Sequence, residues 1–241
     1  MRVYCRKILP EKVNPIWNMK NIKKKLMPYE GGSQYFRERR FQFFLSLINT
    51  LPRPIRILDI GGTYFFWEKM NFTQMPDITF TLLNLYPQEV HGENFTSMIG
   101  DATQLSFKDK EFDLVFSNSV IEHLFTKENQ VKMANEIRRV GKNYFIQTPN
   151  LYFPIEPHWL FPFFQFLPIR VRVFLTQHFT IGGYRKTNDR AKAIERVNEV
   201  RLLSKKEIKE LFPDGNCYEE KFFSLTKSFV MYKFSKANEV L

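Results

Sequence analysis

Two histidines have the sequence context of a general base. His123 follows the polar turn Ser117-Asn118-Ser119, and His158 lies in the proline-rich segment Pro154-Ile-Glu-Pro-His158. An imidazole has an ordinary pKa of about 6.5, so it can accept a proton near neutral pH. The alternative for each is structural: His123 packs partly buried, and His158 caps or packs the segment around it. Both are therefore candidate catalytic residues.

A glycine turn could hold a nucleotide-type ligand. The apolar run Ile55–Ile60 stops at Gly61-Gly62, with Asp59 at its end. Glycine lets the backbone approach a ligand closely, and a helix start offers free N–H groups. Asp59 could bind a cationic or hydroxylated part of that ligand; the alternative is a turn that only ends a strand. The four residues after Gly62 contain no glycine, which counts against a dinucleotide-binding site for NAD or FAD.

Two further polar motifs follow predicted strands. In Gly100-Asp101-Ala102 the carboxylate could accept a hydrogen bond from an adenine amino group. The alternative is a helix N-cap, since Asp101-x-x-Gln104 matches the capping pattern, and both roles are compatible. Ser119-x-x-Glu122 matches it too, so we expect Glu122 to serve a helix end. No spacing of histidine, cysteine and carboxylate indicates a metal site, and we predict none.

The elements that would position these residues alternate along the chain. Strands are expected at 55–60, 78–85, 98–99, 112–116 and 143–147, with a final antiparallel pair at about 217–224 and 228–234; helices are expected at about 35–50, 119–125, 127–140 and 205–212. Such alternation predicts a parallel sheet covered on both faces. Ligands of these sheets bind beyond the carboxyl ends of the strands. The loops at 61–64, 85–88, 101–104, 117–120 and 148–150 should therefore surround one crevice.

The order of these motifs resembles a known family. Ile57-Leu-Asp-Ile-Gly-Gly-Thr63, Gly100-Asp-Ala102, Phe112-Asp-Leu-Val-Phe-Ser-Asn-Ser-Val-Ile-Glu-His-Leu124 and Gln147-Thr-Pro-Asn150 look like the class I S-adenosylmethionine-dependent methyltransferases. The segment from Tyr152 to His158 is similar to a bacterial subgroup related to methyltransferase type 11. The resemblance implies a Rossmann-like α/β fold: a seven-stranded, mostly parallel sheet with helices on both faces and an antiparallel last strand.

The resemblance also implies S-adenosyl-L-methionine as cofactor and a set of cofactor-binding positions. These are Asp59, Gly61 and Gly62 at the methionine portion, Asn84 at the ribose, Asp101 and Ala102 at the adenine, and Asn118 and Ser119 flanking the cofactor; Thr63 and Leu85 complete the set. Thr63 and Phe65 stand where the family commonly has glycines, and Asn84 where it usually has an acid. An amide lacks the charge-assisted hydrogen bond of a carboxylate, so binding could be weaker by about 1–2 kcal/mol.

We therefore expect an enzyme that methylates an oxygen of a small molecule: a glycan, a lipid-linked sugar or a secondary metabolite. The alternatives are an RNA-directed methyltransferase and a catalytically silent cofactor-fold binding protein. The net charge of +11 favours an anionic partner, or else is a solvated basic surface. Nucleic acid is disfavoured, because the basic residues form no long stripe and Ser117–Val120 stands where a base-methylation motif would be.

The expected organisation is a basic N-terminal segment at 1–34 and one methyltransferase domain at 35–241. An aromatic and basic insertion at about 151–200 includes Trp159, Phe161, Phe163, Phe164 and Phe166. It could be a wall over the pocket, a peripheral contact with a membrane, or ordinary core. Cys5 and Cys217 lack disulfide or zinc spacing, and no run reaches the roughly 20 apolar residues of a membrane span. These features favour a cytoplasmic protein with reduced thiols; no oligomeric state follows from them.

Overall fold

The structure, a computed structural model, describes residues 31–235. Its elements are α2 (Gly31–Ile48), β1 (Ile55–Ile60), α3 (Tyr64–Lys69), β2 (Ile78–Asn84), β3 (Phe95–Ile99), β4 (Phe112–Asn118), η1 (Ile121–His123), α4 (Lys127–Val140), β5 (Gly141–Pro149), β6 (Ile155–Glu156), β7 (Phe161–Pro162), η2 (Phe164–Phe166), α5 (Ile169–His178), α6 (Arg190–Asn198), α7 (Lys205–Leu211), β8 (Asn216–Phe222) and β9 (Leu225–Lys233). The predicted segment 1–34 lies outside this range except for its last four residues, where α2 has already begun.

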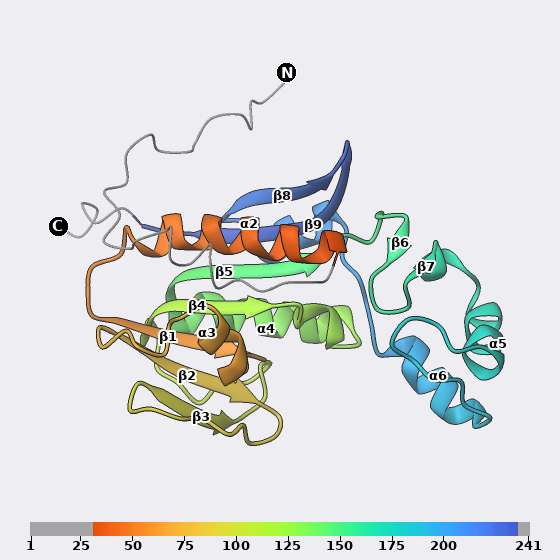
Figure 1. The fold of residues 1–241 in the computed structure, drawn as a ribbon, viewed down its shortest axis with the longest axis horizontal. Helices are drawn as coiled ribbons and strands as arrows, with labels where there is room; N and C mark the ends of the chain where they lie inside the picture. The colour runs from red at the N-terminus through yellow and green to blue at the C-terminus, as the bar shows by residue number, and fades with distance from the viewer. Residues whose placement is uncertain (1–30, 236–241) are drawn as a thin grey trace.

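Seven strands form one sheet in the order β3-β2-β1-β4-β5-β9-β8 (Figure 1). The first five run parallel, and β9 is antiparallel to both of its neighbours. Strand β1 thus lies in the middle of the sheet. Strands β2 and β3 extend the sheet on one side of β1, and β4 and the later strands extend it on the other side. The carboxyl ends of β1 and β4 meet where this order reverses, which is where open α/β sheets bind ligands.

Helices cover both faces of the sheet, as predicted. Alternate residues of each strand point to opposite faces, so Ile57 packs with α2 and α3 while Leu58 packs with α4 and α7. In α2 the apolar residues at 41, 44, 45 and 48 are all buried, which is the helical spacing that predicted it. The sheet therefore has a core on each side.

Several element bounds differ from the prediction. β3 begins at Phe95 instead of Met98, because an edge strand tolerates the polar pair Thr96-Ser97 on a partly exposed sheet edge. The helix expected at 119–125 is only the 3₁₀ turn η1. In α4, Val131 is exposed, whereas Ile137 and Val140 of the same helix are buried.

Residues 151–200 form a small unit beside the carboxyl end of the sheet, with its own core (Figure 1). Trp159 stacks between Phe164 and Tyr184, with ring centroids 4.4 and 4.3 Å away. Of the aromatic run, Trp159 and Phe164 are thus ordinary core, whereas Phe163 and Phe166 are exposed. No helix within residues 31–235 is long and apolar enough to cross a membrane.

Candidate functional site

The turn between β1 and α3 is supported from below by Asp59. Its side chain is 1% exposed, Oδ2 accepts a 2.7 Å hydrogen bond from Trp67 Nε1, and Oδ1 has no partner among the described residues. Burial raises the pKa of Asp59 to about 7. A Cβ on Gly62 would lie 1.7 Å from Asp59 Oδ2, so glycine is required here because the carboxylate occupies that space. Thr63 caps α3 by accepting from the backbone N–H of Phe66.

The ends of β2 and β3 lie directly against this turn. Asn84 Nδ2 donates to the Gly62 carbonyl at 2.9 Å, and the N–H of Gly100 donates to the Asn84 carbonyl at 2.9 Å. Asp101 is exposed, and its Oδ1 accepts from the backbone N–H and the hydroxyl of Thr103. No helix follows Asp101, so the expected helix N-cap was wrong and the carboxylate closes a turn instead. Leu85, which follows Asn84 in the chain, is 70% exposed.

At the end of β4 the chain turns sharply. Ser119 has a left-handed backbone with φ of 57°, and its hydroxyl donates to Gln147 Oε1 at 2.7 Å. The predicted capping box Ser119-x-x-Glu122 was therefore wrong, because the serine side chain is turned toward β5. Asn118 Oδ1 accepts a 2.5 Å hydrogen bond from Arg40 Nη1.

Arg40 brings α2 into the site. Its guanidinium binds both carboxylate oxygens of Glu220 on β8, each at 2.8 Å, in addition to Asn118. The hydroxyl of Ser228 donates to Glu220 as well. The arginine therefore joins three elements at the carboxyl edge of the sheet and fixes the amide of Asn118.

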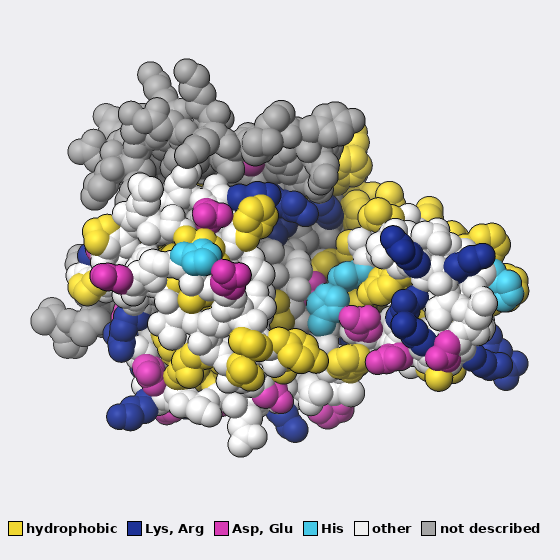
Figure 2. All heavy atoms as spheres, turned by 60° about the horizontal axis from the view of Figure 1, so that its bottom comes forward, with side chains coloured by type: hydrophobic (Ala, Val, Ile, Leu, Met, Phe, Trp, Pro, Cys, Tyr) yellow, Lys and Arg dark blue, Asp and Glu magenta, His cyan; other side chains and the backbone are white. Residues whose placement is uncertain are grey.

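Four titratable side chains meet beyond β4. The rings of His123 and His158 lie 4.9 Å apart between centroids and nearly perpendicular, and Figure 2 shows histidine side chains beside the hollow between the sheet and the 151–200 unit. Glu122 is 0% exposed; its Oε2 accepts from Thr148 Oγ1 at 2.9 Å, and its Oε1 has no partner within residues 31–235. Glu156 Oε1 lies 2.7 Å from His158 Nδ1.

The environments of these groups shift their pKa values in different directions. Burial raises the pKa of Glu122 to about 7. Burial, together with the neighbouring His158, lowers the pKa of His123. Burial also acts to lower the pKa of His158, but the hydrogen bond and charge of Glu156 outweigh it, so that pKa is raised. Titratable groups pushed apart in this way are typical of proton-transfer sites.

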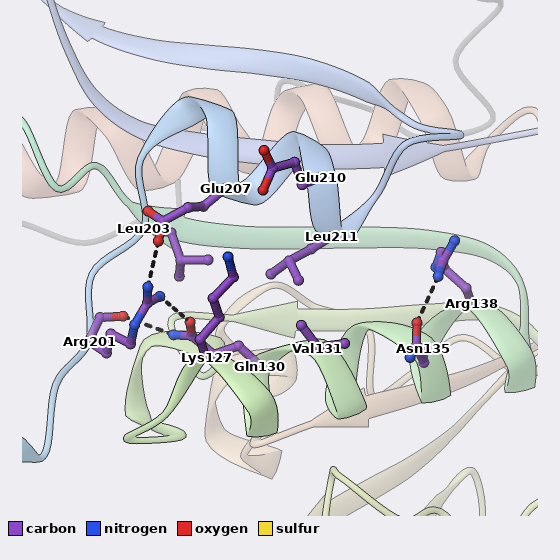
Figure 3. A pocket seen from close by; sticks show the side chains of 10 residues that line it. All are labelled: Lys127, Gln130, Val131, Asn135, Arg138, Arg201, Leu203, Glu207, Glu210 and Leu211. Carbon is purple, nitrogen blue, oxygen red and sulfur yellow. Dashed lines mark hydrogen bonds and ion pairs between the residues drawn. The ribbon is translucent and has the colours of Figure 1, made fainter.

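The cavity drawn in Figure 3 lies elsewhere, between α4 and α7. Arg201 spans it, bound to Gln130 Oε1 and Glu207 Oε1. It is lined by none of the predicted site residues, and Arg201 links α4 to α7 through Gln130 and Glu207. We therefore place the functional site at the carboxyl edge of the sheet.

Known proteins resemble this chain in sequence and in fold. A family model described as a methyltransferase domain matches residues 69–144. Uncharacterized proteins from two strains of Mycobacterium tuberculosis are 38% identical over 56 residues, which are 23% of this chain and 19% of each relative. The match thus spans about a fifth of the length of these curated relatives.

Solved structures share the fold at low sequence identity. A SAM-dependent methyltransferase from Aquifex aeolicus is 13% identical, with 88% of this chain and 96% of that chain covered and a TM-score of 0.50. The magnesium protoporphyrin IX methyltransferase of Synechocystis PCC 6803, with bound SAH, is 11% identical, with 89% and 93% covered and a TM-score of 0.51. These matches show that residues 69–144 resemble a methyltransferase domain and that the chain has the fold of S-adenosylmethionine-dependent methyltransferases.

The structure brings the predicted residues together unequally. Gly61, Gly62, Asn84 and the Gly100–Ala102 turn are adjacent, and Asn118 and Ser119 end the neighbouring strand. Asp59 is buried beneath the turn and does not line an open surface. Arg40, Glu122 and Glu156 were not predicted as functional, since each is a common surface residue type and only its packing makes it unusual.

Proposed function

We propose that this chain is an S-adenosylmethionine-dependent methyltransferase that transfers the cofactor's methyl group to a hydroxyl oxygen of a small molecule of the glycan, lipid-linked sugar or secondary-metabolite class. The observation that carries the proposal is the His123–His158 pair, in which His123 follows the end of β4, where Asn118 and Ser119 lie, and His158 comes from the 151–200 unit. A hydroxyl must lose its proton when it is methylated, and a paired imidazole can accept one. The acceptor side of the site thus holds an imidazole that can take the proton from a hydroxyl.

The residues at the carboxyl edge fit the cofactor. The backbone at Gly61 adopts φ of 77°, a conformation suited to glycine. Because Gly62 follows, neither residue has a side chain that would separate the backbone from a ligand. The exposed carboxylate of Asp101 can accept from an adenine amino group while it holds Thr103. The exposed side chain of Leu85 offers an apolar surface to a flat base.

Different residues of this chain position the reacting groups and take up the proton. Bound S-adenosylmethionine supplies a sulfonium methyl group, which the acceptor oxygen takes as the carbon–sulfur bond breaks with its electron pair going to sulfur. Arg40 holds Asn118 in place, and Glu156 fixes the ring of His158 through Nδ1. His158 Nε2 or His123 takes the hydroxyl proton. Positioning supplies most of the acceleration of such an in-line displacement.

Exposed apolar side chains near the histidines favour an acceptor with an apolar part. Leu160, Phe163 and Phe166 are all exposed on the segment that follows His158. Surface groups of this kind often mark a binding surface when they gather. This arrangement supports a lipid-linked acceptor over a fully polar one, and with it a peripheral contact with lipid.

Calorimetry with S-adenosylhomocysteine tests the cofactor part of the proposal. We expect the wild-type chain to bind S-adenosylhomocysteine. Asp101→Ala should lower that affinity at least about tenfold, because it removes one hydrogen bond to a charged group. Asp77→Ala is the matched control, because Asp77 precedes β2 at the opposite edge and its side chain forms a surface ion pair with Arg53. Absence of binding at millimolar ligand, or equal affinity in both variants, contradicts the proposal. Methylation assays comparing a lipid-linked sugar with its water-soluble analogue then test the acceptor class.

A further inference from the structure

Three side chains beyond β4 are arranged as the ligands of a metal ion. Each of Glu122, His123 and His158 offers one ligating atom, and these atoms all lie within 4.8 Å of one another. Ligands around a tetrahedral Zn²⁺ are about 3.4 Å apart when each bond is about 2.1 Å. The three atoms therefore need to approach one another by at most about 1.4 Å to share one ion.

The carboxylate of Glu122 has a free oxygen at this point. Oε2 is used by Thr148, but Oε1 is buried without a hydrogen-bond partner among the described residues. A buried carboxylate oxygen without a partner is costly. Arg40, the nearby arginine, is already bound to Glu220 and Asn118 and is not free to neutralise it. A bound cation would satisfy both the orphaned oxygen and its charge.

The surroundings of His158 resemble those of a metal-ligating histidine. Its Nδ1 is hydrogen-bonded to Glu156 Oε1 at 2.7 Å, which leaves Nε2 toward the cluster. Glu156 is itself held by the backbone N–H groups of His158 and Trp159, at 2.7 and 2.6 Å. Metal-ligating histidines nearly always donate their second ring nitrogen to such a carboxylate. Neither ring nitrogen of His123 has a hydrogen-bond partner within residues 31–235.

We propose that Glu122, His123 and His158 form a binding site for one divalent transition-metal ion of the Zn²⁺ type, with Glu156 orienting His158. Two imidazoles and one carboxylate suit Zn²⁺, Fe²⁺ or Co²⁺, whereas Mg²⁺ and Ca²⁺ prefer oxygen ligands alone. Three protein ligands leave a position open for an exchangeable ligand. In a consequence that rests on the proposed function, a bound ion would take the acceptor hydroxyl as its open ligand and lower that hydroxyl's pKa, so that the proton passes to solvent water; the histidines act as the base when no ion is bound.

The test measures metal binding directly. The full chain, without a polyhistidine tag and stripped with a chelator, is titrated with Co²⁺ and with Zn²⁺ in the absence of cofactor and acceptor. We expect one ion per chain, a visible Co²⁺ absorption band that Zn²⁺ displaces, and a higher Tm with Zn²⁺. Glu122→Gln and His123→Gln should each lose at least tenfold in affinity, and Glu156→Gln about 10–100-fold.

The control is His178→Gln. His178 belongs to the same 151–200 unit, but its Nδ1 bonds the Phe174 carbonyl outside the cluster, so this variant should bind as tightly as the wild type. Glu122→Gln preserves the shape of the side chain, and circular dichroism of the metal-free proteins checks that each variant folds. Binding well below one ion per chain, or equal affinity in Glu122→Gln and His178→Gln, overturns the site. Calorimetry with S-adenosylhomocysteine on the same stripped protein reports separately on the proposed function.

Discussion

At the scale of single residues, two buried carboxylates at this site each have one oxygen without a hydrogen bond among the described residues, Asp59 Oδ1 and Glu122 Oε1. The two carboxylates differ in the groups that surround them. Glu122 faces two histidines that can share a cation with it. Asp59 faces a tryptophan N–H and the backbone of a glycine turn, so it has no cationic partner there and burial favours its protonated form.

Asp59 should therefore make the stability of the protein depend on pH. The folded chain keeps this proton up to about pH 7, whereas the unfolded chain releases it near the ordinary value of 3.8. The stability that Asp59 contributes is thus complete below about pH 4 and is lost as the pH rises, by up to about 1.4 kcal/mol per pH unit.

Asp59→Asn removes this dependence, because the amide stays neutral and its oxygen can still accept from Trp67. Urea unfolding of the metal-free protein between pH 4 and pH 8 should show the variant gaining stability relative to the wild type as pH rises. A constant difference across that range would mean that Asp59 is ionised in the folded state.

At the scale of elements, the turn from β1 to α3 depends on a close contact between backbone and side chain. Gly62→Ala places a methyl group on the Asp59 carboxylate, which Trp67 holds in place. Overpacking of this kind costs about 1–3 kcal/mol, and it displaces the backbone expected to meet the cofactor. We expect a lower unfolding free energy together with weaker binding of S-adenosylhomocysteine.

Gly183→Ala is the matched control for that change. A Cβ at Gly183 meets no atom within 4 Å, so stability and cofactor affinity should stay near those of the wild type. Equal effects of the two substitutions would show that the Gly62 contact does not determine the turn.

At the scale of the whole molecule, an ion pair connects α2 to the β8–β9 strand pair. Arg40 on α2 and Glu220 on β8 have side chains only 13% and 2% exposed, so neither is well hydrated. Removing one partner of a buried pair costs about 3–5 kcal/mol, because the other charge stays buried alone. Arg40 also binds Asn118, so α2 helps to hold a residue of the candidate site in position.

Arg40→Ala should therefore destabilise the protein by about 3–5 kcal/mol. Arg53→Ala, which breaks a largely exposed pair with Asp77, should cost about 0–1 kcal/mol. The double variant Arg40→Met with Glu220→Met should be more stable than Arg40→Ala alone, because no charge is left buried. Denaturant titrations of the three variants check the order, and a loss in Arg40→Ala no larger than in Arg53→Ala would contradict it.

Much of the fold was predictable because it is dictated locally. The helical spacing at Phe41, Phe44, Leu45 and Ile48 predicted α2, and the β-branched run at Ile55–Ile60 predicted β1 with its observed bounds. One prediction failed because a polar side chain had a distant partner. Ser119 matched a helix cap in sequence, but Gln147 of a neighbouring strand takes its hydroxyl.

The sequence by itself determined the two histidines, the glycine turn and the order of strands and helices, because these follow from residue type and short-range spacing. Only the tertiary structure decided that His123 and His158 touch, and that Glu122 and Glu156 are buried beside them. Contacts between segments far apart in the chain depend on how the sheet and the 151–200 unit pack, and no local spacing encodes that. The candidate bases named from sequence thereby became part of a four-residue cluster that can hold a metal ion.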